Sequence, residues 1–404
     1  MDVERLPRRR VAKAGWTHSA CAQGRLLDVF RLQTELVELI RAEIAKRGQV
    51  SFAWFMEQAL YLCQHGYYSS GRASIGRRGD YFTSVSVGPL FGQLLAAQFV
   101  QVWQRLGQID NFIIAEQGAQ DGDYARDVLG AIRNLQPAFF EALRYRIVEP
   151  FPVLQDRQLQ TLEKFADRVE WRRSPPDLEP FTGIHFSNEL LDAMPVHLLV
   201  STGDGWREKF VALEGDTFVF ADQPIADPTL QAFAKKLPAR PAGYETEVNL
   251  VALDWIDHVA AKLERGHVLA FDYGFSRDEF YAAYRTTGTL QIREKHRQLS
   301  SPFEQIGHAD ITAHVNWTDL AERAESHGLR IAGFTDQHHF ITGIISEMPE
   351  LSEEPKDKRG LQTLLHPEML GRAFQVLALT KGAGPGAPLS GFKFARDPRA
   401  ALGI

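Results

Sequence analysis

The side chains best placed to do chemistry are carboxylates that each follow a short apolar run. Glu116 closes the run 112–115, and a turn that contains Gly118 and Gly122 comes directly after it. A buried parallel strand reads as a continuous apolar run, and glycine lets the backbone approach a ligand that a Cβ would exclude. Residues 124–135 have a helical pattern, and the free amides at the start of such a helix would face that ligand. The segment therefore predicts a nucleotide-type ligand site; the alternative is a surface turn between a core strand and a helix.

A second carboxylate, Glu149, follows the apolar strand predicted over 145–148. In a doubly wound sheet, an acid at this position accepts hydrogen bonds from a ribose diol. The alternative is a solvated acid at a strand end. The glycine turn in the same chain favours the ligand role.

A third group, Asn188, Glu189 and Asp192, follows the strand predicted over 183–187. Polar groups at a strand end beside a ligand are costly to place there for fold reasons alone. If Asn188 begins a helical turn, Glu189 and Asp192 are three residues apart and face the same way. Two such carboxylates could bind a cationic nucleophile or accept its proton. The alternative is helix capping by Asn188, with the two acids stabilised by the helix dipole.

Further polar residues lie at the ends of loops and strands. Asp80 and Thr83 end a long, glycine-studded loop, and loops of that length are usually functional or disordered. Both side chains could contact a ligand, although Asp80 could instead cap the next helix. Asp272, before Tyr273 and Gly274, closes another predicted strand. The histidines lack the usual ligand spacing of a zinc site, so we expect no metal.

The order of elements predicts an α/β fold. Apolar runs alternate with helical patterns such as 249–263 and 317–327, which indicates a parallel sheet with helices on both faces. Ligands of such sheets lie beyond the carboxyl ends of the strands, where the strand order reverses. The runs are 112–115, 145–148, 183–187, 268–271, 330–334 and 373–379.

Other segments lie outside this alternation. We expect a flexible segment over 1–24, a helical N-terminal region over 25–106 with a lid-like loop over 66–79, and a flexible C-terminal tail over 381–404. Turn signals at 202–205 and 214–216 predict an antiparallel β insertion over 196–249. The α/β core then comprises 107–195 and 250–380.

Composition limits the class of protein. A net charge of -6 over 404 residues argues against a general nucleic-acid binder, because such binding neutralises phosphates with Lys and Arg. No run approaches the roughly 18 apolar residues that a membrane helix needs. Two cysteines cannot form a disulfide framework, so we expect a reducing compartment, the cytoplasm; the mitochondrial matrix stays open. The oligomeric state also stays open, with a homodimer as one option.

Together these segments resemble the MidA-like S-adenosylmethionine-dependent methyltransferases, which include the mitochondrial complex I assembly-factor methyltransferases. The resemblance covers about three quarters of the chain, in sequence order. Its segments are 58–61, 66–68, 79–84, 90–92, 116–122, 147–149, 188–195, 205–208, 272–274, 288–290 and 310–315.

The resemblance implies a class I methyltransferase fold: a seven-stranded, mostly parallel, Rossmann-like sheet with an antiparallel last strand. It implies S-adenosylmethionine as cofactor and an arginine on a partner protein as acceptor, with a respiratory-complex subunit as one such partner. The implied cofactor residues are Glu116, Gly118, Gln120, Gly122, Glu149, Asp80 and Thr83. The implied transfer site is Asn188 and Glu189, which we extend to Asp192.

Two departures from the family pattern support an alternative to a methyltransferase, namely a protein without catalytic activity. Ala119 and Gln120 stand where the family usually has proline and glycine, and Val85 and Ser86 follow Thr83-Ser84 where it tends to have proline and glutamate. A non-catalytic assembly or binding protein with a degenerate cofactor pocket would show such changes. A dinucleotide oxidoreductase is disfavoured, because the turn lacks the G-x-G-x-x-G spacing.

Overall fold

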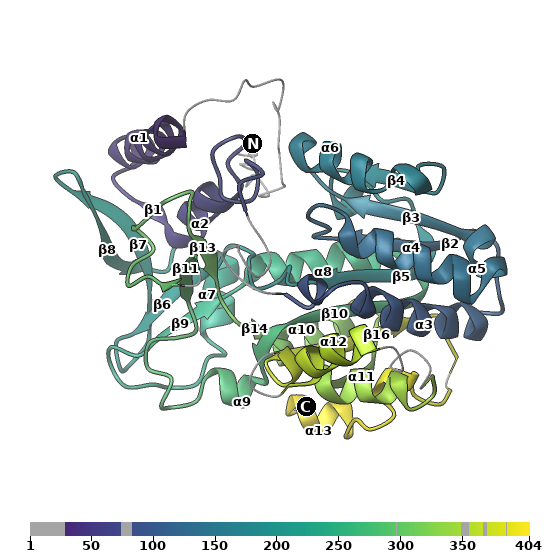
Figure 1. Cartoon of the computed structure of the whole chain (residues 1–404). Helices are drawn as coiled ribbons and strands as arrows, with labels where there is room; N and C mark the ends of the chain where they lie inside the picture. Colours follow the sequence, from purple (N-terminus) through teal and green to yellow (C-terminus); the bar gives the residue numbers. More distant parts are fainter. Residues whose placement is uncertain (1–28, 74–82, 296, 349–354, 367–369, 385) are drawn as a thin grey trace, which may run out of the picture.

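A mostly parallel sheet of eight strands forms the core of one lobe (Figure 1). The computed structural model describes residues 29–73, 83–295, 297–348, 355–366, 370–384 and 386–404. Across the sheet the order is β15 (Arg330–Asp336), β16 (Phe374–Lys381), β10 (Leu263–Phe275), β5 (Phe181–Asn188), β2 (Phe112–Gln117), β3 (Leu143–Val148) and β4 (Val169–Arg172). The two-residue strand β14 (Val315–Asn316) pairs with the end of β10, so the described part of the sheet has eight strands rather than the expected seven.

The strand order places a switch point at β2. The chain runs from β2 to β3 and β4 on one side, then returns to β5 and β10 on the other, with all five strands parallel. The last strand, β16, is antiparallel to both of its neighbours. Ligands of doubly wound sheets bind at such a reversal, beyond the strands' carboxyl ends.

Helices cover both faces of this sheet. Aromatic side chains from α3, α11, β5 and β10 share one core, including Phe91, Phe186, Phe271 and Phe340. The opposite face packs against α8 and α10, with Trp255 and Trp317 buried. None of the helices in the described ranges is long and apolar enough to span a membrane. The α-helices are α1 (Val29–Arg47), α2 (Phe52–Tyr61), α3 (Leu90–Arg105), α4 (Asp123–Leu135), α5 (Pro137–Ala142), α6 (Pro152–Thr161), α7 (Pro228–Ala234), α8 (Leu250–Lys262), α9 (Arg277–Phe280), α10 (Trp317–Ser326), α11 (Gln337–Ile345), α12 (Pro355–Leu365) and α13 (Pro398–Leu402).

An antiparallel β lobe lies beside the main sheet (Figure 1). Its larger sheet contains β1 (Val50–Ser51), β7 (Trp206–Glu214), β6 (His197–Ser201), β9 (Glu245–Val248) and β8 (Thr217–Pro224); its smaller one contains β12 (Arg297–Gln298), β11 (Gln291–Glu294) and β13 (Asp310–Thr312). Helices α1 and α2 pack on this lobe, whereas α3 packs beside α4 on the main sheet. The N-terminal helices are therefore divided between the two lobes.

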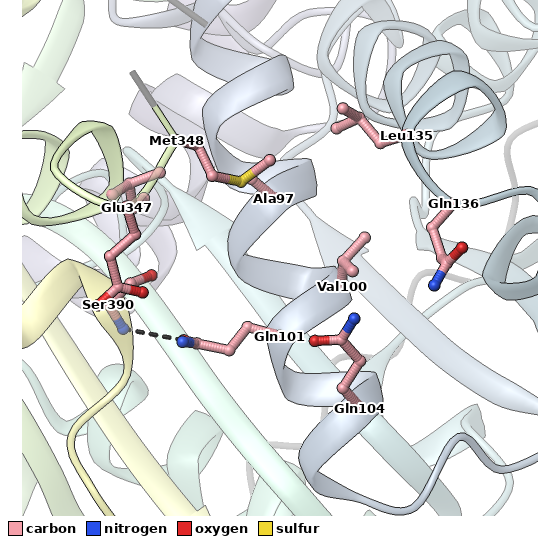
Figure 2. Close-up of a pocket in the computed structure, with 10 residues that line it drawn as sticks. Ala97, Val100, Gln101, Gln104, Leu135, Gln136, Glu347, Met348 and Ser390 are labelled. Atoms are coloured by element: carbon pink, nitrogen blue, oxygen red, sulfur yellow. Dashed lines mark hydrogen bonds between the residues drawn. The ribbon is translucent and has the colours of Figure 1, made fainter. Parts of the chain in front are cut away.

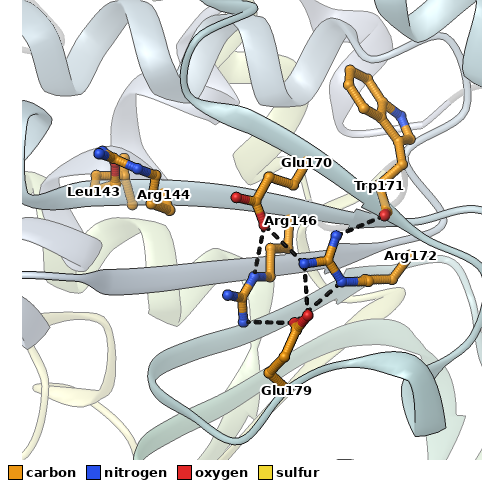
Figure 3. Close-up of polar contacts among 7 residues, drawn as sticks. All are labelled: Leu143, Arg144, Arg146, Glu170, Trp171, Arg172 and Glu179. Atoms are coloured by element: carbon orange, nitrogen blue, oxygen red, sulfur yellow. Dashed lines mark hydrogen bonds and ion pairs between the residues drawn. The ribbon is translucent and has the colours of Figure 1, made fainter.

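The edge strand β4 has no apolar run in the sequence; it pairs with β3 in parallel, and charged side chains on the two strands also interact (Figure 3). Glu170 lies 3.3 Å from the Arg146 guanidinium and 2.9 Å from that of Arg172. Glu179 also pairs with Arg172, at 2.9 Å. Charged side chains are common on edge strands because they discourage pairing with other chains. The same strand carries Trp171, whose indole N–H donates to a side chain of α6.

The C-terminal segment, for which we expected a flexible tail, packs against the core. The 3₁₀ turn Ser390–Phe392 buries Phe392, and the backbone amide of Ser390 donates to Gln101 Oε1 at 2.8 Å (Figure 2). Helix α13 buries Leu402. The glycines and prolines of the C-terminal segment suggested flexibility, but amide side chains on α3 accept hydrogen bonds from the backbone of this segment.

Candidate functional site

The predicted ligand residues meet at one edge of the main sheet. Gln117 of β2 is in register with Val148 of β3 and Ser187 of β5, while Asn188 is in register with Phe271 of β10. The residues that follow these positions therefore emerge side by side at the carboxyl ends of four adjacent strands. They include Gly118, Glu149, Glu189 and Asp272, as the apolar runs in the sequence predict for parallel strands.

The turn after β2 has the left-handed backbone that glycine favours. Gly118 and Gly122 have φ values of +83° and +84°, and Gln120 has a φ of +48°. The Gly122 amide donates to the Ala119 carbonyl at 2.8 Å, and α4 starts at the next residue. Gln120, which occupies a family glycine position, thus adopts a left-handed conformation that glycine would hold without strain.

We predict that Gln120→Gly stabilises the protein by about 0.5–1 kcal/mol, because glycine removes the cost of a left-handed non-glycine residue. The affinity for S-adenosylhomocysteine should stay equal or increase. Urea unfolding and calorimetric titration measure the two quantities. A variant that is less stable and binds more weakly would show that the Gln120 side chain itself supports the turn.

Glu116 lies at the base of this turn and is buried at 3 % exposure. Its Oε2 accepts a hydrogen bond of 2.7 Å from the Tyr145 hydroxyl. Burial raises the pKa of Glu116 to about 7, and the Tyr145 hydrogen bond opposes the rise. The carboxyl group therefore has at least one partner from β3, which orients it at the end of β2.

Glu149 is also buried, at 4 % exposure. Its Oε1 accepts from the Phe151 amide at 3.0 Å, and its Oε2 accepts from Gln158 Nε2 at 3.2 Å. Burial raises the pKa of Glu149 to about 8, against the effect of these two donors. A carboxylate has about four acceptor sites, so two donors leave capacity for the two hydroxyls of a ribose.

This raised pKa leads to a prediction for ligand binding. A ribose diol needs an ionised acceptor, so affinity for S-adenosylhomocysteine should rise with pH as Glu149 loses its proton near pH 8. We expect about a tenfold gain between about pH 7 and about pH 9, measured by calorimetric titration. The control is Glu149→Gln, whose affinity should be low and lack this gain. An equal gain in both proteins would assign the titration to another group.

The loop after β5 is a turn and not the helix that the spacing of its acids allowed. Glu189 follows Asn188 with a φ of +51°, and no helix begins between 188 and 194. The helix-capping alternative for Asn188 therefore does not apply. Asn188 Nδ2 donates to Glu189 Oε1 at 2.8 Å, which orients the carboxylate.

Asp272 organises this loop, a role that its place at a strand end did not reveal. It is fully buried, and its Oδ2 accepts from the amides of Leu190, Leu191 and Asp192 at 3.1, 2.8 and 3.2 Å. Its Oδ1 accepts from the Tyr273 amide at 2.8 Å. Burial raises the pKa of Asp272 to about 7, while these amides favour the ionised form. One carboxylate from β10 thereby shapes the turn that presents Glu189 and Asp192.

Glu189, Asp192, Asp272 and Asp310 form an acidic cluster at this edge. Burial and then the charge of Asp272 raise the pKa values of both Glu189 and Asp192 well above their usual range, and Asp310 adds to each effect. Asp310 comes from β13 of the other lobe and accepts a 2.8 Å hydrogen bond from the Tyr68 hydroxyl. Buried like charges are unfavourable without a compensating cation.

The remaining predicted cofactor residues are Asp80 and Thr83. Asp80 lies outside the described residues. Thr83 is buried at 4 % exposure, and its hydroxyl lies 3.0 Å from that of Ser86. The Ser86 amide also donates to the Thr83 hydroxyl, at 3.2 Å. Ser86, a departure from the family pattern, therefore stabilises the short turn before α3.

A cavity of about 320 Å³ lies away from this edge, between α3, the end of α4 and the end of α11 (Figure 2). Gln101, Gln104, Gln136 and Met348 are among the residues that line it. It contains none of the predicted site residues. The sheet edge, where the acids and the glycine turn converge, is the better candidate for chemistry.

Two known structures share the whole fold. A crystal structure of a Burkholderia thailandensis protein bound to S-adenosyl-homocysteine is 32 % identical, with a TM-score of 0.83, over 95 % of this chain and 100 % of the other. A second Burkholderia thailandensis structure is 30 % identical, with a TM-score of 0.82 and the same coverage.

Curated relatives cover most of the chain as well. "Protein arginine methyltransferase NDUFAF7, mitochondrial" from Rattus norvegicus is 26 % identical over 93 % of this chain and 92 % of the relative. The Homo sapiens protein of the same name is 25 % identical over 91 % and 87 %. A family model described as "Putative S-adenosyl-L-methionine-dependent methyltransferase" matches residues 94–335, more than half of the chain. The chain, whose glycine turn and acids lie where such a sheet binds its ligand, belongs to this family of S-adenosyl-L-methionine-dependent methyltransferases.

Proposed function

We propose that this protein transfers a methyl group from S-adenosylmethionine to an arginine side chain of a partner protein, at the edge formed by β2, β3, β5 and β10. The observation that supports the acceptor most directly is the acidic cluster beside the glycine turn. Three of its four carboxylates, Glu189, Asp192 and Asp272, have pKa values raised by burial and would gain from a cationic partner. A guanidinium stays protonated at neutral pH and matches carboxylate geometry.

The residues at this edge fit the cofactor. Gly118 is exposed and left-handed, and a Cβ added there would meet no atom closer than Leu190 at 3.5 Å, so the backbone can approach a ligand closely. Glu149 retains acceptor capacity for a ribose diol. Among the described residues, Asn188 Oδ1 and Ser187 Oγ are buried without a hydrogen-bond partner, and buried polar atoms normally have one.

Each residue then has a role in methyl transfer. The backbone of the Gly118–Gly122 turn, with Glu116 at its base, would hold the methionine end of the cofactor, and Glu149 would hold the ribose. The bound cofactor supplies an electrophilic methyl group on a positively charged sulfur. Glu189 and Asp192 bind the guanidinium and localise its charge, because a fully delocalised guanidinium is a poor nucleophile. Holding two reactants in a fixed orientation can supply roughly 7–11 kcal/mol of such a barrier.

The proton released from the acceptor nitrogen goes to Glu189. Its Oε1 already accepts from Asn188, so we assign the proton to Oε2. Burial and the neighbouring Asp272 raise the pKa of Glu189 well above its usual value, which makes it a stronger base than an ordinary carboxylate. Asp272 is bound by four backbone amides, which favour its ionised form against the effect of burial, and its negative charge acts on the neighbouring Glu189.

The experiment that tests this function uses the full chain with S-adenosylmethionine labelled in the methyl group and arginine-rich peptides or a cell extract as acceptor. Mass spectrometry should find the label on an arginine nitrogen. Label on lysine, on a carboxylate or on a small amine would contradict the arginine assignment. Failure to bind either S-adenosylmethionine or S-adenosylhomocysteine in calorimetric titration would favour the assembly-protein alternative.

The proposed partner is a protein that carries the methylated arginine. The relatives' names describe protein arginine methyltransferases of mitochondria, and these names support a protein acceptor for this chain. A subunit of a respiratory complex is the partner suggested by the family resemblance, in the cytoplasm of a bacterium or in the mitochondrial matrix. Arginines of co-purifying proteins should therefore be screened first for methylation.

A further inference from the structure

The glycine turn follows β2 and Glu149 follows β3, and one side chain joins them. Gln158 is on α6 and is fully buried. Its Nε2 donates to the Gln120 carbonyl at 2.7 Å and to Glu149 Oε2 at 3.2 Å. The side-chain nitrogen of Gln158 thus connects the glycine turn, which we assign to the methionine end of the cofactor, with Glu149, which we assign to the ribose.

A third contact fixes the orientation of this amide. Trp171 Nε1 of β4 donates to Gln158 Oε1 at 2.8 Å. An indole N–H can only donate, and a backbone carbonyl can only accept. The amide oxygen must therefore face Trp171, and the nitrogen must face Gln120 and Glu149. A flipped amide would lose the hydrogen bonds to Trp171 and to the Gln120 carbonyl.

Packing around Gln158 adds to this constraint. A Cβ placed on Gly122 would lie 3.4 Å from Gln158 Cα and 3.5 Å from its Cγ. The turn and the helix are thus in direct contact, so the amide cannot shift without moving either the turn or Glu149.

From these contacts we infer that Gln158 is a positioning residue for cofactor binding, which holds the Gln120 carbonyl and the Glu149 carboxylate in the arrangement that the ligand needs. The inference rests on the proposed assignment of Glu149 and the Gly118 turn to the cofactor. Gln158 is assigned no contact with the reacting atoms. Its loss should therefore weaken cofactor binding much more than it slows the chemical step.

The test replaces Gln158 with methionine, which preserves length and apolar packing but removes the amide. The matched control is Gln160→Met, an exposed glutamine of the same helix. We expect Gln158→Met to raise the Kd for S-adenosylhomocysteine and the KM for S-adenosylmethionine by about 10- to 100-fold, since a hydrogen bond to a charged group is lost. The kcat at saturating cofactor should change less than about threefold, and Gln160→Met should match the wild type.

A second readout is the pH dependence of binding. The Gln158 donor lowers the pKa of Glu149, so its removal should move the pH at which S-adenosylhomocysteine binding improves to a higher value. Tyr61 of α2 is a titratable side chain that interacts with Glu149, and Tyr61→Phe tests whether it accounts for the shift. A merely structural loss at Gln158 would lower thermal stability without moving this pH value.

Trp171→Phe provides a version of the test that preserves Gln158. It removes the N–H that orients the amide, and we expect a rise in Kd of about threefold to tenfold. This variant decides the question if Gln158→Met does not fold. If the wild type binds S-adenosylhomocysteine and neither Gln158→Met nor Trp171→Phe weakens that binding, the role of Gln158 is overturned but the assigned cofactor site is not. A wild-type protein that binds no S-adenosylhomocysteine would overturn the assigned cofactor site and this inference with it.

Discussion

Replacing Glu189 with glutamine is expected to lower kcat for methyl transfer to an arginine acceptor by about 10²–10⁴-fold. Glutamine keeps an oxygen that can accept from Asn188 Nδ2, so the local hydrogen bond can persist. It cannot receive a proton, and it removes one negative charge from the guanidinium site. The rate is measured under saturating S-adenosylmethionine with the best acceptor found by mass spectrometry.

The folded state should tolerate this change. Burial raises the pKa of Glu189 well above its unfolded value, so its stability contribution is fully present below the unfolded pKa and is lost as pH rises through the folded pKa. Glutamine is neutral throughout, and we expect Glu189→Gln to have a Tm equal to or above that of the wild type at about pH 8. Glu163→Gln, at an exposed position, is the matched control for both measurements. Full activity in Glu189→Gln would contradict the assigned proton acceptor.

The positions of these acids were predictable because each buried parallel strand appears in the sequence as a continuous apolar run. Glu116, Glu149 and Asn188 each follow or end an apolar run, and the carboxyl ends of parallel strands share an edge. The glycine turn was recognisable for the same reason. The sequence shows which residues follow a strand, because that depends only on neighbouring residues in the chain.

Side-chain partners were not predictable, because they depend on contacts between distant segments. Gln158 is an ordinary residue of a helical pattern until Trp171, Gln120 and Glu149 surround it. Asp272 directly follows a predicted apolar strand, but three of its four amide partners lie 80 to 82 residues earlier. Strand β4 was overlooked because its four residues, Val169–Arg172, alternate apolar and charged side chains and form no apolar run.

The turn after β5 shows why residue spacing alone misled. Glu189 and Asp192 are three residues apart, which would align them on a helix. Asp272 instead accepts hydrogen bonds from the amides of Leu190, Leu191 and Asp192. At the start of a helix these amides would have no partner within the helix. A buried carboxylate from a neighbouring strand therefore replaced the helix.

Removal of the Asp272 carboxylate should have the second large effect. Asp272→Ala leaves the amides of Leu190, Leu191 and Asp192 without their buried acceptor, at a cost of about 1–3 kcal/mol for each unsatisfied group. Loss of a buried negative charge offsets part of this cost, so we expect a net destabilisation of about 3–5 kcal/mol. Urea unfolding measures it, with Asp156→Ala at an exposed position of α6 as the control.

Asp272→Asn separates the shape of the loop from its charge. An asparagine oxygen can still accept from the three amides, so we expect a loss of only about 1 kcal/mol, mainly from the Tyr273 contact. After burial, the Asp272 charge is the strongest influence that raises the pKa values of Glu189 and Asp192, and asparagine removes it. Both acids should then ionise at lower pH, and the acid limb of the pH–rate profile should move down. A profile at the wild-type position in a folded Asp272→Asn variant would mean that Asp272 shapes the loop without setting the charge of the site.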